Sequence, residues 1–399
     1  MNKNLLKLAI FSISILTIMA GAAISPALGE ISLAFPNASE TTIKLLLTLP
    51  SVMIIPFIFV SSYLTSRFSK KNILLVGMII YIIGGVGGGL VSSIEMMLIC
   101  RGILGIGVGC MLPISTSLVP DFFDGEERTK TMGQVMACTN LGGVILFTAS
   151  GFLASLNWRV VFGVYLLAVV SIILVYLFLP KINPLKRSPD GVKLRLPGSI
   201  YLYGLGALMV VLVMFSIQSN IALYMVEKEI GDARYAGLIA ATSTAAGFVA
   251  GLVIAQVKRL LQYYLIAALV FSVATGFGII SLAQDPLLMG VGVGMCGFGL
   301  GIILPSIMDQ VSRQVAPTQT VHAMAIVTSM IFVGQFLSPI LLDSIGVLFG
   351  NTTIQFTYQF LTISILIAAV TFFIKSIRKH VSGLRQTVVE NKVNERQNS

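Results

Sequence analysis

The sequence predicts an all-α membrane protein whose twelve transmembrane helices form two pseudo-symmetric six-helix bundles. Of its 399 residues, 56% are hydrophobic and 11% are charged, whereas soluble domains carry about 25% charged residues. The apolar residues continue for about 20 positions at a time, which is the length of a bilayer-spanning helix, and do not alternate with polar ones as in a β-barrel. The two halves of the chain also repeat each other. These observations exclude a soluble enzyme, a nucleic-acid module and a disordered protein.

Polar residues divide the chain into twelve apolar segments. The basic start Met1–Lys7 leads into an apolar run without a small-residue cleavage site, so we expect a retained first helix and not a removed signal peptide. The predicted helices are 6–28, 43–65, 72–92, 96–119, 131–155, 159–179, 199–225, 235–257, 263–283, 287–311, 320–342 and 354–375.

One long polar connection lies almost midway along the chain. It reads PKINPLKRSPDGVKLRLPG (180–198), and its proline, glycine and charge are typical of a linker. We therefore expect a first bundle over 1–180, a cytoplasmic linker over 181–198, a second bundle over 199–380 and a polar cytoplasmic tail over 381–399.

Lysine and arginine gather on one side of the predicted membrane. With the N-terminus in the cytoplasm, 21 of the 26 fall on the cytoplasmic side, whereas the outer side holds Lys44, Arg159, Lys228 and Arg234, and Arg101 lies within the fourth helix. Positive charge favours the cytoplasmic side, so both termini are expected there. This placement explains the net charge of +10 without a nucleic-acid partner.

The fourth and tenth segments carry the internal repeat. GIGVGCMLPISTSLV (105–119) and GFGLGIILPSIMDQV (297–311) match at an offset of 192, which aligns Gly105 with Gly297 and continues to Gly142 and Gly334. Parallel repeats of this kind place a binding site between the two halves near the membrane midplane. Such an arrangement is expected of a transporter.

Three motifs then resemble those of a known family. The loop after the second helix, SYLTSRFSKK (62–71), keeps the basic residues of the pattern G-x3-D-[RK]-x-G-R-[RK] but has serine at both glycines and at the aspartate. Arg101-Gly102-Ile-Leu-Gly105-Ile-Gly107 follows R-x3-G-x-G, and Gly133 and Gly142 keep part of G-x8-G-x3-G-P-x2-G-G. The chain thus resembles the major facilitator superfamily, and within it the twelve-helix bacterial drug–proton antiporters.

The resemblance implies a cytoplasmic gate and a charge relay. The gate would comprise Arg67, Lys70, Lys71, Asp121 and Arg128, with Asp121 accepting Arg67; alternatively the lysines only set the topology. Arg101 would belong to the proton-coupling or substrate cavity, because a charged residue in hydrocarbon usually faces a partner or a wet cavity. Alternatively it extends along the helix to the outer surface.

Few carboxylates lie near membrane depth. Glu30 and Asp309 are the candidate proton carriers, since desolvation raises the pKa of a carboxylate and lets it accept and release protons. Glu95 and Asp343 are interpreted as interfacial carboxylates in contact with water.

The resemblance also suggests which side chains line the cavity and where helices flex. The cavity candidates are Gln134, Asn140, Gln218, Asn220, Phe332 and Gln335, and the flexing candidates are Gly142, Gly334 and Pro339. In the alternative reading these residues face lipid or allow helices to pack closely through small residues.

The predicted function is proton-coupled efflux of lipophilic or cationic drug-like compounds by alternating access, in a bacterial inner membrane. A small-nutrient or anion importer or facilitator, and a lipid or glycolipid flippase, are the alternatives. No catalytic or metal-binding motif indicates an enzyme, and the four cysteines fall in apolar runs as packing residues. We expect a small-molecule substrate, the lipid bilayer as partner, a monomer, no cofactor, and the proton gradient as energy source.

Overall fold

The apolar segments form long helices in the computed structural model, which describes residues 3–180, 196–316 and 319–397. The helices of the first half are α1 (Lys3–Ala22), α2 (Leu28–Ala34), α3 (Glu40–Leu64), α4 (Lys70–Leu90), α5 (Ile94–Phe122), α6 (Gly125–Leu156) and α7 (Leu167–Phe178). Those of the second half are α8 (Gly198–Lys228), α9 (Ala233–Leu261), α10 (Leu265–Leu282), α11 (Pro286–Arg313), α12 (Thr320–Leu348) and α13 (Ile354–Gln397). Short 3₁₀ turns link some of them, and the described residues contain no strand.

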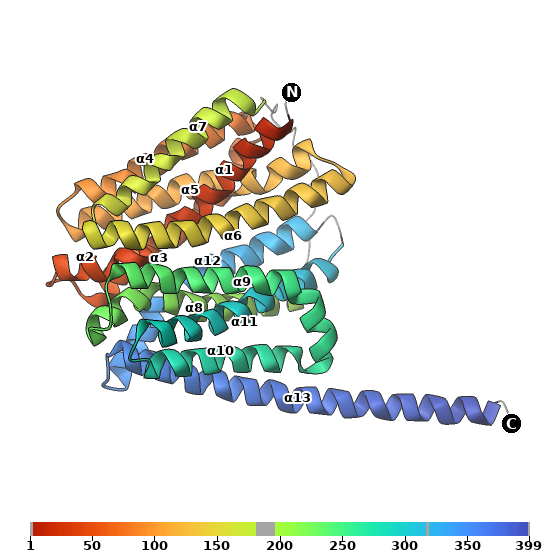
Figure 1. Ribbon diagram of the computed structural model, residues 1–399. Coiled ribbons are helices and arrows are strands. Elements are labelled where there is room, and N and C mark those ends of the chain that lie inside the picture. The colour runs from red at the N-terminus through yellow and green to blue at the C-terminus, as the bar shows by residue number, and fades with distance from the viewer. Residues whose placement is uncertain (1–2, 181–195, 317–318, 398–399) are drawn as a thin grey trace.

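The number of membrane crossings agrees with the sequence prediction. Eleven helices of the described chain are long and apolar enough to span a bilayer, and one of these, Ala233–Leu282, has 50 residues. It contains α9 and α10, which are joined by the turn Gln262–Tyr264 and run in opposite directions (Figure 1), with α11 packed against both. The fold is therefore consistent with twelve crossings.

Small polar side chains begin several helices at the predicted polar breaks. The hydroxyl oxygens of Ser39, Ser69 and Ser93 accept hydrogen bonds from the backbone N–H groups three residues later at α3, α4 and α5. Asp285 does the same at α11. Such caps satisfy N–H groups that have no partner within the helix, so the polar residues between apolar runs also fix where each helix starts.

The first and the last helix differ most from their predicted spans. The first is interrupted: α1 ends at Ala22, a 3₁₀ turn covers Ser25–Ala27, and α2 continues to Ala34. Pro26 lies in that turn, and proline has no N–H with which to continue a regular helix. The last helix, α13, runs to Gln397 through the region predicted as a polar tail, and it leaves the bundle as a long projection (Figure 1). The predicted linker falls mainly on 181–195, outside the described residues.

The helices pack as two groups, α1–α7 and α8–α13. Within the first group α5 packs on α3 and α4, and within the second α11 packs on α9 and α10, so the repeated segments occupy the same place in each group. The chain starts at the end of the bundle from which α13 projects (Figure 1). We call this the terminal end, and the opposite end the distal end. Lys44, Arg159, Lys228 and Arg234 all lie at helix ends on the distal side.

Candidate transport pathway between the helix groups

Polar side chains join α3 of the first group to α12 of the second. The Lys44 ammonium lies 2.8 Å from a carboxylate oxygen of Asp343, and the Thr41 hydroxyl donates to the other oxygen at 2.6 Å. Deeper in the bundle, the Ser51 hydroxyl donates to the side-chain oxygen of Gln335 at 2.7 Å. Only 2% of Lys44 is exposed, whereas 19% of the Asp343 side chain is, so the attraction between the two charges is less screened than in a fully exposed pair.

The interrupted first helix makes a second contact between the groups. The Ser25 hydroxyl donates to the backbone carbonyl of Gln218 in α8 at 2.6 Å. Gly29 of α2 approaches α8 so closely that a Cβ there would lie 2.8 Å from the carbonyl oxygen of Ala222. The break in the first helix thus brings its distal half against the second group.

A third contact joins α6 to α9 through two glycines. A Cβ on Gly151 would lie 2.6 Å from the carbonyl oxygen of Ala233, and one on Gly237 would lie 2.5 Å from that of Phe147. Helices approach this closely only where side chains are minimal. We call these three sets of contacts the distal seam, because each lies in the distal half of its helices.

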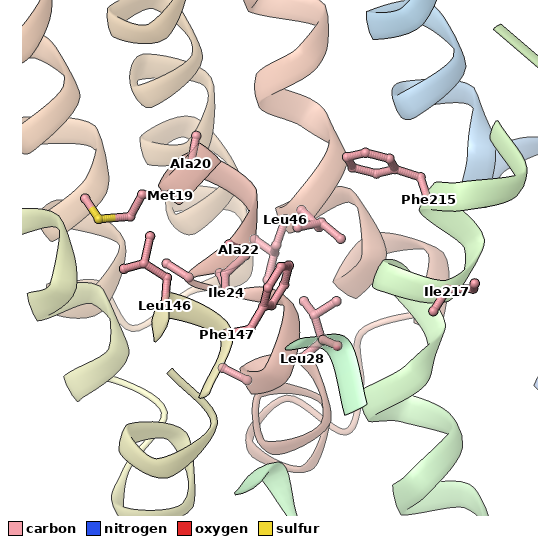
Figure 2. Close-up of a cluster of buried hydrophobic side chains, with 14 of the residues drawn as sticks. Met19, Ala20, Ala22, Ile24, Leu28, Leu46, Leu146, Phe147, Phe215 and Ile217 are labelled. Atoms are coloured by element: carbon pink, nitrogen blue, oxygen red, sulfur yellow. The ribbon is translucent and has the colours of Figure 1, made fainter. Parts of the chain in front are cut away.

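Apolar side chains fill the space behind the distal seam. Ile24, Leu28 and Leu46 of the first group and Phe215 and Ile217 of the second are at most 9% exposed. Figure 2 shows them gathered with Phe147 between the broken first helix, α3 and α8. We call this cluster the apolar plug. Together with the distal seam it closes the space between the groups at the distal end.

The two groups separate toward the terminal end. Along α6 and α9, Gly151 and Gly237 touch, whereas Gly133 and Gly251, which lie nearer the terminal end, have no neighbouring heavy atom within 4 Å of a Cβ position. The two helices diverge in the same direction in Figure 1. The helices α6 and α9 are therefore in contact distally and apart toward the terminal end, and we infer a pathway between the groups that opens toward the terminal end.

The predicted cavity residues do not all border this space. Gln335 lies at the inner end of the distal seam, and Gln218, Asn140 and Phe332 are partly exposed on α8, α6 and α12. Gln134 is exposed on α6 toward the terminal end. Asn220 differs, because it is 1% exposed and donates to the carbonyl of Ser216 in its own helix; it borders no open space here.

Two of the predicted gate residues, Lys70 and Lys71, join helices within the first group. The Lys70 ammonium lies 2.6 Å from Asp121 and 2.9 Å from the Ser117 hydroxyl. Asp121 therefore pairs with Lys70 and not, as expected, with Arg67.

The other gate residues make separate contacts. Arg67 stacks on the Tyr63 ring. Lys71 donates to the carbonyl of Tyr176, and Arg128 is exposed at the start of α6. The hydrogen bonds and ring contacts described here do not reach the second group.

Arg101 is enclosed within the first group. It is 0% exposed and donates to the Leu46 carbonyl, the Tyr165 hydroxyl and the Ala20 carbonyl at 2.7, 2.6 and 2.5 Å. In this structure its side chain borders no open space between the groups and does not reach the outer surface; its expected part in proton coupling stays a prediction.

The candidate acids occupy different places. Glu30 lies beyond the predicted end of the first helix at residue 28 and is partly exposed in α2, which continues past it to Ala34. Asp309 is 40% exposed and pairs with Arg313 one turn later in α11 at 3.0 Å. Asp343, interpreted as merely interfacial, instead joins the two groups. No group of three His, Cys, Asp or Glu side chains that could hold a metal ion occurs within the described residues.

The glycines predicted to flex their helices are close-packing positions. A Cβ on Gly334 would lie 2.5 Å from the Leu208 carbonyl oxygen, and one on Gly142 would lie 3.2 Å from the Ile15 side chain. Pro339 lies within α12, which runs unbroken to Leu348.

Sequence reasoning missed most of the distal seam. Lys44 carried a signal, since it is one of few cations on its side of the chain. Asp343 carried one as well, as one of few carboxylates near membrane depth, but nothing in the sequence indicates which helices of the two groups meet, so its partner and the places of Ser51 and Gly237 could not be predicted.

A helical pathway of this kind, closed at one end and bounded by two repeated groups, is the architecture of an alternating-access membrane transporter. The family model of the Major Facilitator Superfamily matches residues 10–339. The chain therefore belongs to the Major Facilitator Superfamily, whose members transport small molecules and are not enzymes. Whether it is a drug–proton antiporter is a narrower question, because its relatives differ in what they carry.

Two relatives illustrate how the substrates named for similar proteins differ. The arabinose-proton symporter of Escherichia coli (strain K12) is 30% identical over 121 residues, which is 30% of this chain and 26% of that protein. The multidrug transporter protein MdtP of Bacillus subtilis (strain 168) is 30% identical over 119 residues, or 30% of this chain and 21% of that protein. The matched segments thus span about a quarter of the length of these relatives.

Solved structures match almost the whole chain. A bacterial homologue of the human lysosomal transporter Spinster, in an inward-facing and occupied conformation, superposes with a TM-score of 0.71 at 17% identity over 94% of this chain and 97% of its own. The POT family transporter PepTSo gives a TM-score of 0.75 at 12% identity over 94% and 98%. At these identities the likeness establishes the fold alone.

Proposed function

We propose that this transporter exports lipophilic compounds, including cationic ones, in exchange for protons. It would act as a monomer in the bacterial plasma membrane with both termini in the cytoplasm, so the distal end would face outward. The concentration of lysine and arginine on the terminal side supports this orientation. The structure would then correspond to an inward-open state, whose cavity could load substrate from the cytoplasm or the inner leaflet.

The apolar plug is the observation that carries the substrate class. In this state the plug side chains Ile24, Leu46, Phe147 and Phe215 are buried and close the inner end of the proposed pathway, and the Ser51–Gln335 hydrogen bond lies at the inner end of the distal seam. Apolar and aromatic walls with a small number of polar groups suit lipophilic ligands. A sugar would need a matching hydrogen-bond partner for most of its hydroxyl groups.

The proton would be carried by a carboxylate whose partner changes between states. Glu30 and Asp309 are candidates from the family resemblance, with Arg101 as a charge relay. Asp343 joins them, because its ion pair with Lys44 bridges the two groups and must break when the distal end opens. When the distal end is open, the terminal end would be closed with the help of the cytoplasmic gate residues Arg67, Lys70, Lys71, Asp121 and Arg128.

A liposome assay tests the proposal. The purified protein is reconstituted with an internal pH-sensitive dye, and lipophilic cations and neutral drugs are added one at a time. We expect proton movement that depends on the drug and that is lost in Glu30→Gln, Asp309→Asn or Asp343→Asn. Glu95→Gln is the matched control, because Glu95 is exposed in the first turn of α5, and this variant should retain the flux.

A sugar or nutrient importer is the second candidate, supported by the similarity to an arabinose-proton symporter. In the same liposomes, proton flux driven by pentoses but not by drugs would favour it. Drug flux without proton movement would indicate a facilitator. A third alternative is a lipid flippase, supported by the similarity to a triacylglyceride transporter of Mycolicibacterium smegmatis; transfer of a labelled lipid between leaflets would favour it.

A further inference from the structure

Arg101 is the most enclosed cation of the described chain, and two of its three partners are backbone carbonyls. These carbonyls belong to different helices: Leu46 in α3 and Ala20 in α1. The third partner, the hydroxyl of Tyr165, also lies 3.3 Å from the Ala20 carbonyl. The guanidinium has no carboxylate within ion-pair distance in the described residues, so its contacts serve the backbone rather than another charge.

Both carbonyls are left without their usual helical partner. The carbonyl of residue 46 would accept from the N–H of residue 50, but that residue is Pro50, within α3, and proline has no N–H. The carbonyl of Ala20 lies where α1 ends, and the N–H of Ile24, which would have served it, bonds to Gly21 instead. An unpaired carbonyl in a membrane interior costs several kcal/mol, and Arg101 satisfies both.

The helix contact at Pro50 explains how the side chain reaches them. Gly105 lies one turn after Arg101 in α5, and a Cβ there would lie 2.5 Å from the carbonyl oxygen of Pro50. The glycine lets α5 approach α3 at its proline, which places the guanidinium beside Leu46. Arg101 and Gly105 lie one turn apart in α5, and their contacts in α3, Leu46 and Pro50, also lie one turn apart.

The internal repeat supplies a control within the molecule. At the offset of 192, Arg101 corresponds to Val293 in α11, and α9, which takes the place of α3 in the second group, contains no proline. Val293 is 0% exposed. The arginine thus occurs in the first group, where Pro50 leaves a carbonyl of α3 without its helical partner. In the second group, where α9 has no proline, a valine takes its place.

We propose that Arg101 is a positioning residue that holds the first group's side of the distal seam. Leu46 lies two residues after Lys44, which pairs with Asp343. Ala20 lies just before the turn that carries Ser25, which donates to the Gln218 carbonyl. By tying both backbones to α5, Arg101 fixes the two segments that close the distal end. This role does not depend on which substrate is transported or on proton coupling.

Restoring the missing N–H tests the role directly. In Pro50→Ala the new N–H can donate to the Leu46 carbonyl, so the stability of this variant should depend less on Arg101. We expect Arg101→Met to lower the melting temperature in detergent, and this loss should be roughly halved in the Pro50→Ala background, because one of the two carbonyls then has its own partner. If Arg101→Met does not fold alone, Arg101→Lys with and without Pro50→Ala gives the same comparison.

A distance measurement separates positioning from general stability. Spin labels at Leu33 and Leu348, exposed on α2 and α12 at the distal end, report the gap between the groups when the four native cysteines are replaced. We expect a longer and broader distance in Arg101→Lys, since one ammonium cannot replace the planar fork of donors, and a return toward the original distance in Arg101→Lys with Pro50→Ala. An unchanged distance in Arg101→Lys, or the absence of any rescue by Pro50→Ala, would overturn the proposal.

Discussion

Single buried polar side chains in this protein secure the backbones and termini of other helices. Lys70 shows this at the terminal end, where its side chain is 7% exposed and its ammonium joins Asp121 and Ser117 of α5 to the first turn of α4. A lysine so enclosed must be paired, because desolvating an isolated ammonium is costly. We therefore interpret it as a brace of the first group that also remains available to a gate.

Removing Lys70 should lower stability. In Lys70→Ala the free energy of unfolding should fall by roughly 1–3 kcal/mol, between the values for surface and buried pairs, since the Asp121 side chain is 27% exposed and can regain water. Thermal unfolding in detergent measures this. Arg259→Ala, at an exposed position near the end of α9, is the control, and an equal shift in both variants would contradict the brace.

Helix pairs meet at positions where small residues let backbones touch. Gly151 of α6 and Gly237 of α9 form such a crossing between the groups, and Gly133 of α6 lies where the helices have parted. Gly151, which falls on the last glycine of the pattern G-x8-G-x3-G-P-x2-G-G that starts at Gly133, thus lies where α6 and α9 come closest. We infer that its role is in closing the distal end and not in bending α6.

A larger side chain at the crossing should open the distal end. In Gly151→Val the added atoms would meet the backbone of α9, so the arrangement in which α6 and α9 separate distally should be favoured. Spin-label distances between Leu33 and Leu348 should lengthen. Gly133→Val is matched in helix and chemistry but meets no neighbour and should leave the distance unchanged; the same change in both variants would refute the closing role.

For the molecule as a whole, the distal seam determines which end of the pathway is closed. The Lys44–Asp343 pair at 2.8 Å links the groups at the rim of this seam, with Glu40 3.3 Å from the same ammonium. Opening the distal end must separate Lys44 from Asp343 and expose both to water. We therefore infer that the pair favours the state in which the distal end is closed.

Breaking this pair should expose the seam. With Thr48→Cys as a reporter, because Thr48 lies buried one turn below Lys44, Asp343→Asn should speed labelling by a membrane-impermeant maleimide added at the distal side. The charge exchange Lys44→Asp with Asp343→Lys should slow it again, while Glu95→Gln should have no effect. Equal labelling rates in all variants would show that the pair does not bias the state.

The fold could be predicted from the sequence because its signals are local. Lengths of apolar runs, serine caps at their starts and the repeat at offset 192 gave the helices and the two groups, with most boundaries within a few residues. The interruption at Pro26 and the helical course of the chain after residue 375 were not foreseen, since a run of suitable composition does not reveal where a helix breaks or continues.

The pathway depended on contacts between residues far apart in the chain. Lys44 and Asp343, Ser25 and Gln218, and Gly151 and Gly237 come together because two separately packed groups meet on one side. Arg101 was recognised as exceptional from its charge in an apolar run, but its partners follow from a proline and a helix break in two other helices. Hydrophobic patterning acts along each helix and can be read from the chain, whereas the pairing of polar groups depends on which backbones come within hydrogen-bond distance.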